Sequence, residues 1–180
     1  MKSLLRLAAI TAIVLLHACK DKSETSQTDN LFKFKDYITH HTYGNQSIAA
    51  PIRIELAKPL EQFELTEEID PSYLKIHPKT EGTLLIENST TLIFQPTEYL
   101  KPDTEYTVTV QLGKLYKDIG KEFKAYTFAF KTITPNLKLD LDNLQSYSKQ
   151  WQYVSGSLET SDVITLDKAK QLVTAVQEGK

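Results

Sequence analysis

Apolar and polar side chains alternate in short runs over the middle of the chain, the period of strands that bury one face. In residues 52–56 the aliphatic side chains share one face, and Arg53 and Glu55 share the other. Residues 105–112 repeat this alternation. Further short strands, each bounded by turn residues, are predicted at residues 74–76, 83–86, 91–94 and 126–130. No long helical pattern interrupts the series, which predicts an all-β sandwich over residues 48–133.

Beyond Thr132 the pattern changes. Residues 134–136 are typical of a linker, and residues 137–141 and 152–158 are typical of strands. Apolar residues then recur at helical spacing, at Leu166, Ala169, Leu172, Val173 and Val176. Asp167 could cap the start of this helix and Gly179 its end. Such a short segment cannot bury a core of its own. We therefore expect residues 134–180 to begin a second, incomplete domain, and the chain to be the front part of a longer protein.

The first residues have the pattern of a secretory signal. Lys2 and Arg6 supply positive charge, residues 4–16 are almost wholly apolar, and no acidic residue precedes Asp21. The apolar run is roughly a dozen residues, whereas a membrane-spanning helix needs about 20. This favours a cleaved signal peptide over residues 1–18 rather than a retained span.

The end of this signal carries one chemical motif, Leu16-His17-Ala18-Cys19. It resembles the lipobox of bacterial lipoproteins, which implies cleavage between Ala18 and Cys19 and a diacylglyceryl group on Cys19. Such acyl chains anchor a protein stably, so the lipid bilayer is the first expected partner. Cys19 is the only cysteine of the chain, which excludes an intramolecular disulfide.

Residues 19–31 are polar and predict a flexible tether, followed by a linker or lead-in strand at residues 32–47. Lysine followed by acidic residues after Cys19 resembles the surface-export signal of Bacteroidetes lipoproteins. The resemblance implies a location on the outer membrane and favours the cell surface over the periplasmic face. Cleavage removes two of the 21 basic residues and none of the 23 acidic ones. The mature chain is therefore mildly acidic, which argues against nucleic-acid binding.

The segment containing Leu100, Pro102 and Tyr106 matches a tyrosine corner, in which a tyrosine at the start of a strand bonds back to the preceding arch. A solvent-facing tyrosine that stacks on a ligand is the weaker alternative, because the motif supplies a local hydrogen-bond partner.

Five elements occur in the order and spacing of a known family: residues 50–54, 74–78, 92–96, 100–106 and 128–132. Together they resemble the bacterial Ig-like domain of the SbsA-like or Big-5 type. The resemblance implies an Ig-like antiparallel β-sandwich of Greek-key topology, whose usual role is spacing or adhesion.

Residues 144–158, 160–163 and 168–173 resemble the opening of the first macroglobulin-like domain in Bacteroidetes α2-macroglobulins. The resemblance implies a non-catalytic spacer at the N-terminus of an endopeptidase inhibitor. Downstream macroglobulin-like domains, and target proteases engaged through them, would be its partners. Some members also use a Cys-Gln thioester, for which this chain has no cysteine other than Cys19.

Three polar groups could carry chemistry. Adjacent residues of a strand point to opposite faces, so His40 and His41 are interpreted as surface histidines of a linker rather than metal ligands. Asp140 and Asp142 could touch calcium, but a solvated strand explains them better, since calcium usually takes about six to eight oxygens. The acidic residues before Pro71, namely Glu67, Glu68 and Asp70, fit a loop or the start of a short helix.

Trp151 and Tyr153 have the spacing of one strand face. Burial in a core or an inter-domain contact is the favoured interpretation, and a carbohydrate platform is the alternative. The sequence has no nucleophile elbow and no glycine-rich phosphate loop, so we expect no enzyme and no cofactor. The competing function is a stand-alone adhesion or glycan-binding Ig-like lipoprotein.

Overall fold

The computed structural model describes residues 30–176. The chain divides into two units, Met1–Lys33 and Phe34–Lys180, and only the second is described almost throughout. The predicted signal peptide, Ala18, Cys19 and nearly all of the tether lie outside the described residues. None of the helices within residues 30–176 is long and apolar enough to cross a membrane.

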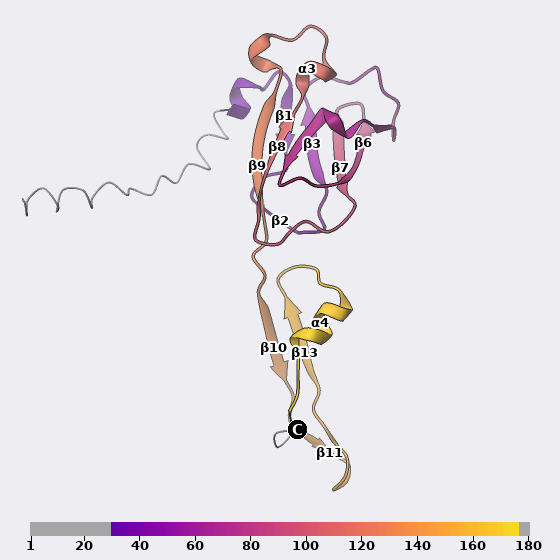
Figure 1. Ribbon diagram of the computed structural model, residues 1–180, viewed down its shortest axis with the longest axis vertical. Coiled ribbons are helices and arrows are strands. Elements are labelled where there is room, and N and C mark those ends of the chain that lie inside the picture. Colours follow the sequence, from indigo (N-terminus) through magenta and orange to yellow (C-terminus); the bar gives the residue numbers. More distant parts are fainter. Residues whose placement is uncertain (1–29, 177–180) are drawn as a thin grey trace, which may run out of the picture. The chain divides into compact units, whose positions relative to one another are not determined.

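Two sheets form the body of the second unit (Figure 1). The five-stranded sheet is antiparallel throughout and has the order β1 (Ile38–His41), β3 (Ile52–Leu56), β7 (Thr91–Pro96), β6 (Gly82–Asn88) and β4 (Glu68–Ile69). The four-stranded sheet has the order β2 (Asn45–Gln46), β9 (Tyr126–Thr132), β8 (Glu105–Val110) and β5 (Leu74–His77). In that sheet β2 runs parallel to β9, and the other pairs are antiparallel.

The chain changes sheet repeatedly. It passes from β1 to β2 and back to β3, then from β4 to β5 and back to β6, and finally from β7 to β8. This is a Greek-key sandwich, and the predicted Ig-like antiparallel fold is confirmed.

The alternation of apolar and polar residues determines which face of each strand is buried. In β3 the aliphatic residues are buried and the residues between them are partly exposed. In the other sheet the buried face of β8 meets that of β9, where Val108 lies opposite Phe128 and Tyr106 opposite Phe130. Each fully buried side chain of this size contributes roughly 1.5–3 kcal/mol through lost contact with water.

Strand β8 is shorter than predicted. It ends at Val110, and Leu112 begins a short helix, α3 (Leu112–Leu115). Leu112 remains fully buried. The alternation therefore identified a core residue correctly, although Leu112 lies in a helical turn and not in a strand.

The acidic run before Pro71 divides between two elements. Glu68 belongs to β4, and Asp70 caps the 3-10 helix η1 (Pro71–Tyr73). The Asp70 carboxylate accepts the Ser72 amide at 2.7 Å, as the expected helix start requires. A second 3-10 helix, η2 (Lys121–Phe123), precedes β9.

The sandwich extends further toward the N-terminus than the boundary predicted at residue 48. Strand β1 pairs with β3, and Ile38 is completely buried. The lead-in strand, rather than a linker, therefore occupies residues 38–41. The interpretation of both histidines as surface residues is wrong for His41, which is buried, and right for His40, which is exposed.

The remaining residues form a small tail. Strand β10 (Leu137–Leu141) pairs with β13 (Gly156–Thr160), and β11 (Gln145–Ser146) pairs with β12 (Gln152–Tyr153). The single strand predicted over residues 152–158 is thus divided in two.

Helix α4 (Leu166–Leu172) is the last helix or strand of the described tail. Its cap is Thr165, whose hydroxyl accepts the Lys168 amide at 3.3 Å, and not Asp167 as predicted. Asp167 lies in the first turn instead. Gly179 lies outside the described residues.

Candidate functional site

The arch before β8 is built around Tyr106. Its ring is buried and stacks on Phe130 with centroids 5.4 Å apart. Its hydroxyl accepts the Lys101 amide at 2.9 Å, the back-bond that defines a tyrosine corner. Leu100 is buried beneath the arch and Pro102 is exposed on it. Tyr106 therefore holds the arch and presents no ring to solvent.

A buried threonine ties the same arch to the end of β9. The Thr132 hydroxyl donates to the Lys101 carbonyl at 2.6 Å and accepts the Thr104 amide at 2.9 Å. Asp103, which has a positive φ of 49°, binds Lys131 at 2.6 Å and Thr134 at 2.7 Å. The Lys131 ammonium and the Thr134 hydroxyl lower the pKa of Asp103. The exit of β9 is thus fixed to the arch by several polar contacts.

These sheets and their arch correspond to a known family, since the model of the bacterial Ig-like domain matches residues 39–132. The chain belongs to the bacterial Ig-like domain family. No curated protein matches the chain.

The Ig-like domain buries one ionisable side chain near β1. The His41 ring stacks on Phe128 with centroids 4.2 Å apart, and its Nδ1 lies 2.8 Å from the Thr42 carbonyl. Burial lowers the pKa of His41, the Thr42 carbonyl opposes that shift, and the nearby His40 adds to it. His41 is therefore a neutral core residue, and its neighbour His40 points elsewhere, so the two do not form a ligand pair.

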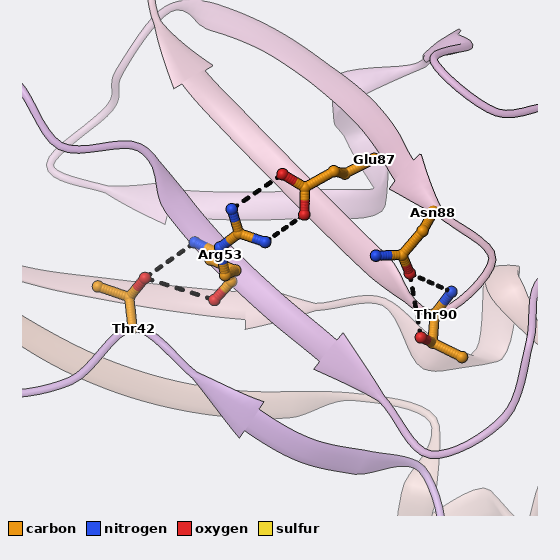
Figure 2. A network of polar contacts seen from close by, with 5 residues as sticks. All are labelled: Thr42, Arg53, Glu87, Asn88 and Thr90. Atoms are coloured by element: carbon orange, nitrogen blue, oxygen red, sulfur yellow. Dashed lines mark hydrogen bonds and ion pairs between the residues drawn. The ribbon is translucent and has the colours of Figure 1, made fainter.

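The outer face of the five-stranded sheet has a polar brace (Figure 2). Arg53 on β3 reaches across β7 to Glu87 on β6, and both guanidinium nitrogens contact the carboxylate. This bidentate bond raises the pKa of Arg53 and lowers that of Glu87. Beside it, the Thr42 hydroxyl accepts the Arg53 amide at 2.8 Å. The pair links β3 to β6 across β7, and each charged group is satisfied by the other.

The two aspartates of the tail do not converge. Asp140 pairs with Lys138 at 2.7 Å, and Asp142 accepts the Ser155 hydroxyl at 2.6 Å. Within residues 30–176 no group of three or more His, Cys, Asp or Glu side chains is placed to hold a metal ion. Each aspartate has a hydrogen-bonding role inside the tail.

The tip of the tail exposes three aromatic rings. Trp151 is 75% exposed and lies just before β12, while Tyr153 lies within it. Tyr147, which the sequence interpretation did not single out, is 81% exposed and stacks on Tyr153 with centroids 5.5 Å apart. Its hydroxyl, 3.5 Å from that of Tyr153, is the main cause of a raised Tyr153 pKa. The described chain therefore buries none of these rings, and burial would require a partner.

A second residue that the sequence interpretation missed is Asp162, which links the tail to the Ig-like domain. A lone aspartate in a turn carries no local signal for such a contact. Only the folded arrangement reveals it.

Proposed function

We propose that this chain is a non-catalytic segment of a surface lipoprotein, anchored by acylated Cys19, in which the Ig-like domain is a spacer. The macroglobulin-like part of an α2-macroglobulin-type protease inhibitor would follow it. Members of this domain family are typically non-catalytic, which supports the spacer role.

One observation carries the proposal: the Ig-like domain buries its apolar residues, whereas the tail leaves them exposed. The Ig-like domain covers its own core, but every residue of β10 is exposed, including Leu137, Leu139 and Leu141 on one strand face. A two-stranded sheet with an open apolar face needs another layer for independent stability. Further strands of a macroglobulin-like domain are the layer that the sequence resemblance favours.

The inhibitor hypothesis is tested by translating the gene beyond the codon for Lys180. Repeated macroglobulin-like domains are expected there. An early stop codon would sink the hypothesis.

The anchor is tested by metabolic labelling with a palmitate analogue. Cys19→Ala should abolish labelling, whereas the matched control Ser23→Ala should keep it. Label retained by Cys19→Ala would refute acylation at this residue. Surface display is tested separately with proteinase on intact cells, where protection of the chain would favour the periplasmic face.

The exposed rings of Trp151 and Tyr153 favour one alternative, a stand-alone adhesion or glycan-binding lipoprotein. Aromatic faces are suited to stacking on sugars because they offer a flat apolar surface. A glycan array probed with the chain and with Trp151→Ala tests this. Binding that the substitution removes would support the alternative, and a silent array would count against it.

A further inference from the structure

The tail is joined to the Ig-like domain at more than its covalent linker. The chain leaves β9 at Thr132 and enters β10 at Leu137. After β13 it returns to the same end of the sandwich, where the Asp162 carboxylate accepts the Ser47 hydroxyl at 2.6 Å and the Ile48 amide at 2.7 Å. These partners lie between β2 and β3, far from Asp162 in sequence.

The turn that Asp162 contacts is itself well held. The Ser47 hydroxyl also accepts the Ala49 amide at 3.1 Å, and the Ile48 carbonyl accepts the Leu100 amide at 2.9 Å. Leu100 belongs to the tyrosine-corner arch. The turn is therefore hydrogen-bonded to the tyrosine-corner arch and is not a loose loop.

The tail side of the contact is equally fixed. Ser161 and Asn136 exchange hydrogen bonds, with both donor–acceptor distances at 2.9 Å, and the Ser161 hydroxyl also donates to the Thr134 carbonyl at 3.2 Å. Asp162 accepts the Val163 amide at 2.8 Å. The returning strand and the linker thus lie together where the tail begins.

We propose that Asp162 is a clasp that makes the joint between the Ig-like domain and the tail rigid. A single covalent linker would leave the Ig-like domain and the tail free to reorient, which is the ordinary expectation for a small interface. A second attachment between the tail's return strand and residues 47–48 removes that freedom. Charge-assisted hydrogen bonds suit this task, since they are roughly twice as strong as neutral ones. The clasp holds whether or not the chain is lipid-anchored or belongs to an inhibitor.

The electrostatics agree with this geometry. Burial alone would raise the pKa of Asp162, but the bonds from Ser47 and from the Ile48 and Val163 amides outweigh burial, and the pKa is lowered. The carboxylate is therefore ionised at neutral pH, in the form that accepts these bonds.

Two measurements on the full chain test the clasp. Amide hydrogen exchange at Ile48 should accelerate roughly ten- to a hundredfold in Asp162→Ala, because the loss of a bond to a charged acceptor has that size. Spin labels at Lys75→Cys in β5 and Ser157→Cys in β13, in a Cys19→Ala background, should give a narrow distance distribution. Asp162→Ala should broaden it at least twofold.

The matched control is Asp142→Asn, which removes a carboxylate bonded to a serine within the tail alone. It should leave both readouts unchanged, and Ser47→Ala should give an intermediate broadening. The proposal is overturned if the Asp162→Ala distribution keeps its width, even when Ile48 exchanges faster. It is equally overturned if the unsubstituted chain is already as broad as Asp162→Ala.

Discussion

Two buried tyrosines on neighbouring strands differ in whether the hydroxyl has a hydrogen-bond partner. Comparing them measures how much the hydroxyl bond of the tyrosine corner contributes to stability. Tyr106 on β8 is 2% exposed and Tyr126 on β9 is 0% exposed. The Tyr106 hydroxyl accepts the Lys101 amide at 2.9 Å. Within the described part of the chain, the Tyr126 hydroxyl has no hydrogen-bond partner. Burial raises the pKa of Tyr126 to about 12, which keeps this phenol neutral.

Replacing each tyrosine by phenylalanine removes the same oxygen with opposite expected results. Tyr106→Phe deletes a made bond and should lower the free energy of unfolding by about 1 kcal/mol, approaching ~3 kcal/mol if water cannot reach the freed amide. Tyr126→Phe deletes a buried group with no partner, whose desolvation is already unfavourable. It should therefore leave stability unchanged or raise it by up to ~1 kcal/mol.

Urea unfolding and calorimetry on the two variants provide the assay. For a domain of this size about 1 kcal/mol corresponds to a Tm change of roughly 4–8 °C, so Tyr106→Phe should melt clearly below Tyr126→Phe. Equal losses in both variants, or a larger loss in Tyr126→Phe, would refute the assignment of the hydroxyl partner as the deciding difference.

Three further predictions concern other parts of the chain. Burial lowers the pKa of His41 below its ordinary value of 6.5, so at acidic pH the unfolded chain binds a proton at His41 that the folded chain does not. The contribution of His41 to the free energy of unfolding should therefore be constant above about pH 6.5 and become less favourable as the pH drops below it. His41→Gln should flatten this dependence in urea titrations, and His40→Gln should not. Gly82→Ala places a Cβ 2.5 Å from the Phe94 ring and should cost roughly 1–3 kcal/mol by urea unfolding; an unchanged midpoint would contradict this. Thr165→Ala should speed amide exchange in the first turn of α4 through loss of about 1 kcal/mol of capping, and unchanged protection there would count against the cap.

Local alternation predicts the strands of the sandwich well. Strands β3 and β10 have the bounds that their apolar period indicates. Neighbouring side chains along a strand must point to opposite faces, so this information is contained in the segment itself. The arch around Tyr106 is similarly local, because its partner Lys101 is only five residues away.

Contacts between distant segments account for what the sequence does not predict. Strand β1 looks polar because of its two histidines, but the His41 ring is buried against Phe128 and Tyr126 on β9. The same holds for Asp162, whose partners at residues 47 and 48 come from the other part of the chain. Burial of a polar side chain depends on what it meets, which periodicity does not encode.

The tail shows a second limit of prediction from sequence. The same alternation predicts a strand there, but it does not predict whether the apolar face of that strand is buried. In β3 the alternating aliphatic residues are buried, whereas in β10 the corresponding leucines are 43–63% exposed. Completing the burial of such side chains would contribute up to roughly 1.5–3 kcal/mol each, a gain that the described chain forgoes. A clasp that fixes the orientation of an uncovered sheet makes physical sense when a covering layer must meet it in one register. The proposed clasp at Asp162 and the open face of β10 are therefore physically related. If a further layer covers that face, a tail hairpin held in one direction has little conformational freedom left to lose on association.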